Sequence, residues 1–347
     1  MTKKIALIFG ITGQDGSHLA DLLIKKKYKV IGVKRRSSSF NTKRIDHLLF
    51  KDNVIKPNNN FELLYGDLTD SSNILRIIRS TKPDEIYNLG AQSHVRTSFD
   101  IPEFTANVDA IGSLRILEAI RILNLEKKTK YYQASTSEIF GNTYIPQNEK
   151  TPFRPRSPYA IAKLYAYWTT VNFREAYDIF AVNGILFNHE GPRRGENFVS
   201  KKITKSVAEI HRGKRKFFSL GNLNAKRDWG SAKDYVESMW LMLQSKKASD
   251  YVIATGKSYS VKQFVEEAFK FINIKIGWRG KDLKEIGFNK KDGRILVKVD
   301  PIYFRPTEIN ELRGDSKKAK SQLRWKPKTS FKQLVKEMMM FDLKEIK

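Results

Sequence analysis

The sequence contains no cysteine, which excludes disulfide bonds and thiolate metal sites. Its five histidines do not fall at the paired spacings of metal ligands, so we predict no metal site. The apolar run Ile5–Phe9 before Gly10 is too short for the core of a secretory signal. Elsewhere no run approaches the roughly 18 apolar residues that span a bilayer. We therefore expect a soluble, cytoplasmic protein that does not bind a membrane.

Acidic residues are outnumbered: 37 Asp and Glu face 64 Lys and Arg, for a formal charge of +27. Such an excess suits phosphate-bearing partners, and nucleic acid is one alternative. The lysines are spread in short clusters, such as 25–27 and 246–247, and the chain has no Cys/His fingers or leucine-zipper heptads. We expect most of this charge to lie on a solvated surface, a few cations to serve a substrate site, and no nucleic acid to bind.

The first residues have the order strand, glycine turn, helix. A wholly apolar strand in KKIALIFG is followed by GITGQDG and then by SHLADLLIKKKY, which has apolar residues at helical spacing. Gly10, Gly13 and Gly16 stand where a tight turn, a close approach to pyrophosphate and close helix packing each exclude a Cβ. The helix N-terminus offers free N–H groups to the anion. This order predicts a dinucleotide-binding fold.

The end of the second strand, YKVIGV, indicates which dinucleotide binds. The strand ends at Lys34 and continues into Arg35 and Arg36, about 20 residues beyond the glycines. An acidic residue near this point holds the ribose 2′-hydroxyl of NAD, whereas an arginine accommodates the 2′-phosphate of NADP. The three cations favour NADP, with a basic loop in a basic protein as the alternative.

Further strands alternate with helices up to KYYQAS, which predicts an α/β fold: a Rossmann-type doubly wound parallel sheet with a smaller C-terminal substrate domain. We predict an NADP-binding domain over residues 1–187, to which about 225–255 return, and a mainly substrate-binding domain over 188–347. Ligands bind at the carboxyl ends of such strands. Four candidate residues lie there: Asp67, Gly90, Ala91 and Ser135.

The stretch SPYAIAK, residues 157–163, opens a long predicted helix. Ser157 is a candidate N-cap and Pro158 suits the first turn, so Tyr159 and Lys163 lie one turn apart on one face. An ammonium roughly 4 to 5 Å from a phenolate stabilises it by about 3 to 4 kcal/mol at an effective dielectric constant near 20. We therefore expect Lys163 to lower the pKa of Tyr159 and make it a base. The alternative is that both are ordinary helix residues.

With these motifs the chain resembles the extended short-chain dehydrogenase/reductase family. The matching residues are the glycine turn GITGQDG, the GDL turn at 66–68, and Thr136, Tyr159 and Lys163 as the catalytic hydroxyl, tyrosine and lysine. More narrowly, the chain is similar over almost its whole length to the branch of GDP-mannose 4,6-dehydratases. The stretches KRRSSSFNT, NHEGPRRGE and RDWG carry that narrower resemblance.

The resemblance implies an NADP-dependent lyase that converts GDP-mannose to GDP-4-keto-6-deoxymannose, as in deoxyhexose biosynthesis toward GDP-fucose. Such a reaction oxidises C4, eliminates water across C5 and C6, and returns the hydride to C6. It also needs a base for the C5 proton, and Glu138, two residues beyond Thr136, is placed for that role. In the related dTDP-glucose dehydratases an aspartate precedes the glutamate. Here Ser137 stands there, so the proton for the departing 6-hydroxyl comes from Glu138, water or another group.

The resemblance also assigns binding residues. For the cofactor it implies Gly10, Thr12, Gly13, Gln14, Asp15, Gly16, Arg35, Arg36, Asp67, Leu68, Leu89, Gly90, Ala91, Ser93, Tyr159, Lys163, His189 and Arg194, the last two at the nicotinamide end. For the substrate it implies Ser93, Asn188, Lys202, Arg227, Arg305 and Glu308, with the cations meeting the pyrophosphate. It further implies a homo-oligomer, a dimer or tetramer, in which RRSSSFNTKR reaches into a neighbouring subunit.

Two rival functions stay open. One is another nucleotide-sugar dehydratase, or a bifunctional enzyme that also reduces its 4-keto product. The other is a non-catalytic NADP-sensing regulator with the same fold. The set of Thr136, Glu138, Tyr159 and Lys163 favours an enzyme, because such regulators usually lack the tyrosine and lysine.

Overall fold

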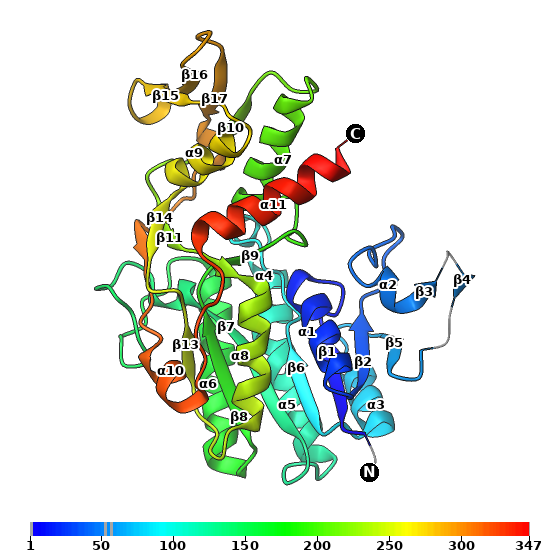
Figure 1. The fold of residues 1–347 in the computed structure, drawn as a ribbon. Helices are drawn as coiled ribbons and strands as arrows, with labels where there is room; N and C mark the ends of the chain where they lie inside the picture. Colours follow the sequence, from blue (N-terminus) through cyan, green and yellow to red (C-terminus); the bar gives the residue numbers. More distant parts are fainter. Residues whose placement is uncertain (1–2, 52–53, 56–57, 347) are drawn as a thin grey trace.

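The computed structural model describes residues 3–51, 54–55 and 58–346 and divides into two lobes (Figure 1). The lower lobe in the figure contains the central sheet and the N-terminus. The upper lobe contains the C-terminal end of the last helix, α11, and several short strands. In the described residues no helix has the length and apolar character needed to cross a membrane.

The central sheet has seven strands in the order β13-β8-β7-β6-β1-β2-β5, and every neighbouring pair is parallel. Its strands are β1 (Ile5–Phe9), β2 (Lys29–Lys34), β5 (Phe61–Tyr65), β6 (Glu85–Asn88), β7 (Lys130–Thr136), β8 (Ala181–Leu186) and β13 (Tyr251–Ile253). From β1 the chain adds β2 and β5 on one side, and then β6, β7, β8 and β13 on the other, as in doubly wound folds. The predicted fold class is confirmed. The division at residue 187 stays a prediction, although β13 comes from the second half of the chain.

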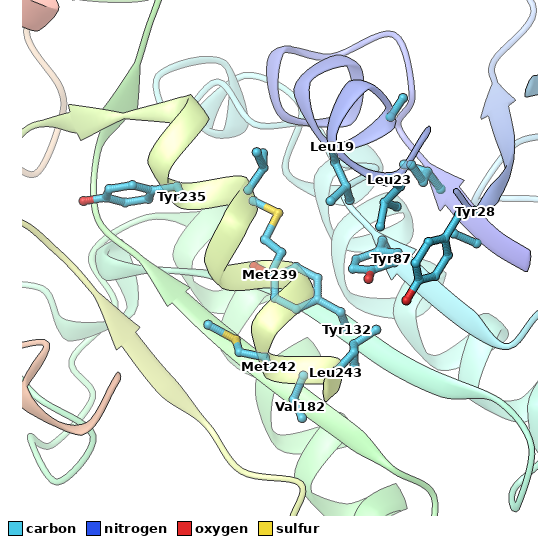
Figure 2. Close-up of a cluster of buried hydrophobic side chains, with 14 of the residues drawn as sticks. Leu19, Leu23, Tyr28, Tyr87, Tyr132, Val182, Tyr235, Met239, Met242 and Leu243 are labelled. Atoms are coloured by element: carbon cyan, nitrogen blue, oxygen red, sulfur yellow. The ribbon is translucent and has the colours of Figure 1, made fainter. Parts of the chain in front are cut away.

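Alternating side chains of the strands form two cores on opposite faces of the sheet. Ala6 and Ile8 of β1 point into one core, which also takes up α1 (Gln14–Lys25) and α8 (Ala232–Gln244). Figure 2 shows this core: Tyr235, Met239 and Met242 follow one face of α8, with Leu19 and Leu23 of α1 beside them.

The other core takes Leu7 and Phe9 of β1 together with α3 (Ser71–Thr81) and α5 (Gly112–Ile122). The long helix α6 (Pro158–Tyr177) packs beside α5. At its start the Ser157 hydroxyl accepts a hydrogen bond from the Ala160 backbone N–H at 3.1 Å, and Pro158 is the first helical residue. The predicted N-cap is therefore confirmed.

The upper lobe has its own core, built on Trp229 and aromatic residues of α9. Its helices are α7 (Val199–His211), α9 (Val261–Phe271) and α11 (Phe331–Glu345). Its sheets are β10 (Phe218–Leu220), β17 (Ile295–Val299), β16 (Ile286–Asn289) and β15 (Ile276–Arg279), and β14 (Ser258–Ser260), β11 (Lys226–Asp228) and β18 (Glu311–Leu312). Shorter elements are α2 (Asp46–Leu49), α4 (Pro102–Ala106), α10 (Lys317–Leu323), β3 (Phe50–Lys51), β4 (Val54–Ile55), β9 (His189–Glu190) and β12 (Gly230–Ser231).

Candidate active site

A cavity of about 960 Å³ opens at the carboxyl ends of β1, β6, β7 and β8 and extends to residues of the upper lobe. It brings together most of the predicted site residues: Gly10, Gly13, Gln14, Asp15, Gly16, Leu89, Ala91, Ser93, Thr136, Glu138, Tyr159, Lys163, Asn188, His189, Arg194, Lys202, Arg227, Arg305 and Glu308. Six others lie outside its lining: Thr12, Arg35, Arg36, Asp67, Leu68 and Gly90. Residues from both halves of the chain thus meet in one cavity.

The glycine turn has the geometry that the sequence predicts. Gly10 has φ +81°, a left-handed conformation that favours glycine, and a Cβ there would lie 2.7 Å from the backbone of Leu89. A Cβ on Gly16 would lie 2.4 Å from the carbonyl oxygen of Gly10, so the helix can start this close to the strand only without one. Gly13 is the N-cap of α1 and has no side chain to cap the helix. The first N–H groups of α1 are therefore available to an anion.

The predicted residues outside the lining surround the glycine turn and the neighbouring strand ends. Arg35 and Arg36 follow β2 and are exposed. Asp67 accepts hydrogen bonds from the backbone N–H and the hydroxyl of Thr69, at 3.0 and 2.8 Å. Leu68 is buried, and a Cβ on Gly90 would lie 2.7 Å from its side chain. Asp67 and Leu68 thus shape the turn after β5.

Thr136, Tyr159 and Lys163 lie together at the end of β7 and the start of α6. All three are buried, with Tyr159 at 8% and Lys163 at 3% exposure. The Lys163 ammonium donates to the carbonyl of Ala134 at 3.2 Å and lies 5.9 Å from the centre of the Tyr159 ring. The tyrosine and the lysine therefore share one face of the helix.

The prediction that Lys163 lowers the pKa of Tyr159 is wrong: the groups of the protein by themselves raise that pKa. Burial raises the pKa of Tyr159 above its ordinary value, and the carboxylates of Asp109 and Glu138 add to that rise. A hydrogen bond from Thr136 and the charge of Arg194 oppose it without cancelling it. Burial also lowers the pKa of Lys163. The cost of burying the phenolate exceeds the stabilisation that the surrounding groups provide.

Asp109 is a buried acid beside this pair that the sequence analysis missed. It is 1% exposed and lies in a π-helical turn, Asn107–Ile111, where its Oδ1 accepts from the Gln92 N–H at 2.7 Å. Burial raises its pKa to about 6, while the charge of Lys163 works in the other direction. The only signal in the sequence is one acidic residue in the otherwise apolar stretch before Gly112.

Glu138 follows Thr136 in a short 3₁₀ turn, Ser137–Phe140, where its N–H donates to the Thr136 hydroxyl at 3.2 Å. Its carboxylate is paired with Arg305: both oxygens lie 3.2 Å from Nη1 of that arginine. Arg305 was predicted to hold the substrate. The candidate base Glu138 and Arg305, a candidate residue for binding the substrate diphosphate, are thus in direct contact.

His189 and Asp15 join the loop after β8 to the start of α1. His189 Nε2 lies 2.6 Å from Asp15 Oδ2, its Nδ1 lies 2.7 Å from the Phe187 carbonyl oxygen, and its ring stacks on Tyr235. Two acceptors on one imidazole favour the doubly protonated form. Burial lowers the pKa of His189, but the Asp15 carboxylate outweighs it, so the net pKa is raised. Burial likewise opposes the charge of His189 at Asp15, whose pKa is lowered to about 2.

Arg44 is a second residue that the sequence analysis missed. Its guanidinium donates to the carbonyls of Arg193 and Thr12, at 2.6 and 3.2 Å, and lines the cavity. Arg44, at the end of the RRSSSFNTKR segment, therefore contacts its own chain. The reach of this segment into a neighbouring subunit stays a prediction. Phe40 in the middle of the segment is fully exposed.

The remaining candidate residues line the far part of the cavity. Lys202 of α7 lies over the ring of Tyr303 at 3.3 Å, and Arg194 pairs with Glu190 at 2.9 Å while lying over Phe198. Arg227 is 6% exposed and donates to main-chain carbonyls. These cations make one end of the cavity suitable for phosphate groups.

The family model described as GDP-mannose 4,6 dehydratase matches residues 7–338. The chain belongs to this family. It is 58% identical over 342 residues to the GDP-mannose 4,6 dehydratase of Homo sapiens, covering 98% of this chain and 92% of that protein. The relative from Drosophila melanogaster is 57% identical over 341 residues, 98% of this chain and 86% of that protein. The GDP-mannose 4,6-dehydratase of Vibrio cholerae serotype O1 is 56% identical over 356 residues, 99% of this chain and 95% of that protein. The resemblance found in the sequence is confirmed.

Solved structures share the fold at lower identity. The UDP-glucose 4-epimerase of Thermotoga maritima has a TM-score of 0.80 at 24% identity, over 99% of this chain and 100% of that chain. The dTDP-glucose 4,6-dehydratase of Bacillus anthracis, solved with NAD, has a TM-score of 0.79 at 19% identity, over 98% and 97%. The GDP-mannose 4,6-dehydratase family thus shares its fold with other nucleotide-sugar enzymes.

The His189–Asp15 pair predicts a pH-dependent contribution to stability. A raised histidine pKa stabilises the fold below the ordinary value of 6.5, and this contribution is lost as the pH rises through the folded value. The lowered pKa of Asp15 stabilises the fold above 3.8, and that part is lost as the pH falls toward about 2. His189→Gln should therefore lower the free energy of unfolding by about 2 kcal/mol at pH 6.

Denaturant titrations of both proteins at pH 6 and pH 10 measure this effect, and the difference from wild type should shrink at pH 10. His211→Gln, at an exposed histidine that ends α7, is the matched control and should change little at either pH. An equal loss for His189→Gln at both values would contradict a charged pair.

Proposed function

We propose that this chain dehydrates GDP-mannose to GDP-4-keto-6-deoxymannose with NADP, a reaction that begins and ends with the same form of the cofactor. The observation that carries the proposal is the buried group of Thr136, Glu138, Tyr159 and Lys163 in one cavity. Family membership supports it, because the relatives are named for this reaction.

The residues around the glycine turn fit a nicotinamide dinucleotide. Gly13, the N-cap of α1, has no side chain, so a pyrophosphate can approach the free backbone N–H groups at the start of the helix. Tyr159 and Lys163 would lie at the nicotinamide end, with Arg194 and His189 nearby in the lining. When bound, the cofactor would supply a hydride acceptor for C4 in its oxidised form and a hydride donor for C6 in its reduced form, and the positive charge of the oxidised nicotinamide would oppose the raised pKa of Tyr159.

In the mechanism that this geometry supports, each buried group handles one proton. Tyr159, hydrogen-bonded to Thr136, takes the proton of the 4-hydroxyl as the C4 hydride leaves. The resulting 4-keto group acidifies C5, and Glu138 takes that proton while hydroxide leaves C6 as water. The proton for this water comes from Glu138, a water molecule or another group. Lys163 would place its positive charge near Tyr159 and the cofactor from the same helix face.

The substrate diphosphate is proposed to lie against Lys202, Arg227 and Arg305, with Asn188, Glu308 and Ser93 nearby in the lining. Guanidinium groups bind phosphate oxygens in pairs, which suits the two arginines. The guanine and mannose specificities rest on family membership.

The rival of a non-catalytic regulator is disfavoured by the complete catalytic set. A cytoplasmic location stays a prediction.

We further propose a homo-oligomer in which α6 meets the same helix of a second copy. Ile161, Tyr165 and Trp168 form an apolar stripe on this helix at positions i, i+4 and i+7, with exposures of 58%, 43% and 54%. A two-fold axis lets the same face of two copies cover each other. Sedimentation velocity of the wild-type chain decides this, since a monomer at micromolar concentration would contradict it.

Two variants should stop the proposed reaction at different steps. Tyr159→Phe removes the base for the 4-hydroxyl and should lower turnover of GDP-mannose at least about 100-fold. Glu138→Gln should still transfer the C4 hydride to the cofactor and back, but it should not eliminate water. Both steps are followed by mass spectrometry of the nucleotide sugar, and Tyr177→Phe, at the exposed end of α6, is the control with wild-type turnover. Near-normal activity of Tyr159→Phe, or dehydration by Glu138→Gln, would show that the roles are misassigned.

The basic end of β2 predicts a preference for NADP over NAD. Arg35→Asp places a carboxylate where the 2′-phosphate would lie, so we expect the ratio of NADP to NAD affinity to fall at least about 10-fold, consistent with loss of a charged hydrogen bond. Calorimetric titration with each cofactor measures the ratio, and Lys320→Asp, on the exposed face of α10, controls for net charge. A wild-type preference for NAD, or an unchanged ratio in Arg35→Asp, would contradict the proposal.

A further inference from the structure

The contact between Glu138 and Arg305 raises a question about the order of events. The two side chains come from segments 167 residues apart, and both oxygens of the carboxylate face Nη1 of the guanidinium at 3.2 Å. The Glu138 side chain is 9% exposed and that of Arg305 is 25% exposed. A carboxylate held in this way has both oxygens engaged, which hinders it from taking a proton from carbon.

The two arginines near Glu138 are held differently. Arg227 donates from Nη1 to the carbonyls of Lys226 and Ile309, both at 2.9 Å, so the main chain fixes its charge. Arg305 contacts carboxylates: Glu138, and Glu308 at 3.9 Å from Nε. A competing anion can therefore draw the Arg305 guanidinium away without breaking a main-chain bond.

The backbone that carries Arg305 is attached to the catalytic segments. Asn142, just after the Glu138 turn, donates to the Glu308 carbonyl at 2.8 Å and accepts from the Asn310 N–H at 3.0 Å. The Thr307 hydroxyl donates to the carbonyl of Arg156, shortly before Tyr159. Because these bonds fix the loop, a change of rotamer at Arg305 suffices to move its charge between neighbouring anions.

We propose that Arg305 couples the diphosphate subsite to Glu138: it covers the carboxylate until the diphosphate of the substrate draws the guanidinium away. A diphosphate ester carries more negative charge than one carboxylate and offers paired oxygens to a guanidinium. Glu138 then faces the sugar as a free base only when the nucleotide is in place. Arg305 acts as a positioning residue, and the inference rests on the proposed function.

The pH dependence of turnover tests this coupling. The profile of kcat/KM reports the groups of the free enzyme, whereas that of kcat reports the complex with substrate. Arg305, Arg227 and Tyr159 are the charged or titratable groups that lie close enough to Glu138 to interact with it, and Glu308 acts on the two arginines. In the wild type the acid limb of kcat/KM should lie at lower pH than that of kcat, because the guanidinium faces the carboxylate only in the free enzyme.

Arg305→Gln should bring the two acid limbs together, because the cation is gone from both states. Arg305→Lys keeps a cation and should retain part of the separation. Lys202→Gln is the matched control. Lys202 lies over the ring of Tyr303 in the same cavity, so its removal should raise KM but leave the separation of the two acid limbs unchanged. If Arg305 only bound the diphosphate, Arg305→Gln would behave like Lys202→Gln: KM would rise and the separation of the limbs would stay unchanged.

The outcomes separate the coupling from the proposed function. A wild type that fails to convert GDP-mannose refutes the function, and with it the coupling. A wild type that converts GDP-mannose but has coincident acid limbs overturns the coupling alone, and so does an Arg305→Gln variant whose limbs stay apart. If thermal unfolding shows that Arg305→Gln is not folded, the wild-type profiles and the Arg305→Lys variant still test the coupling.

Discussion

The site depends on the parallel pairing of the central sheet. Because β1, β6, β7 and β8 run in one direction, their carboxyl ends open on the same edge. The glycine turn after β1 and Thr136 at the end of β7 are thereby brought together over more than 100 residues of sequence. Both faces of the sheet are covered by helices, so the polar groups at this edge are the ones left to meet a ligand.

The chemistry follows from how these polar groups are buried. Burial makes the charged forms of Tyr159 and Lys163 costly, and it brings the buried acid Asp109 close enough to influence both pKa values. Charge introduced by ligands therefore has a large effect on these groups, since little water screens it. Glu138 and Arg305 form an ion pair in the same cavity. The arrangement suits an enzyme whose proton transfers are governed by what is bound.

Sequence reasoning was strongest where local pattern determines structure. The apolar run before Gly10, the glycine spacing, and Ser157 and Pro158 before Tyr159 each predicted an element that the structure confirms. These features depend on backbone conformation and helix ends, which a few neighbouring residues fix.

It was weaker where the outcome depends on long-range packing. Asp109 stands out in the sequence only as an acid in an apolar stretch, and no local pattern places it beside Lys163. No local pattern places Arg44 over Thr12 either. The pKa of Tyr159 was misjudged for the same reason, since burial is a property of the whole fold. The pairing of Glu138 with Arg305 also joins segments that no local pattern connects.

The central claim is that hydride leaves C4 and returns to C6 of the same sugar, and the position of an isotope tests it most directly. GDP-mannose carrying deuterium at C4 should yield a 4-keto-6-deoxy product labelled at C6, without net accumulation of NADPH. In deuterated water with unlabelled substrate, C5 should take up solvent deuterium, because Glu138 exchanges its proton. Label retained at C4 would indicate an epimerase, and label on released cofactor would indicate an ordinary dehydrogenase. Either result would contradict the account.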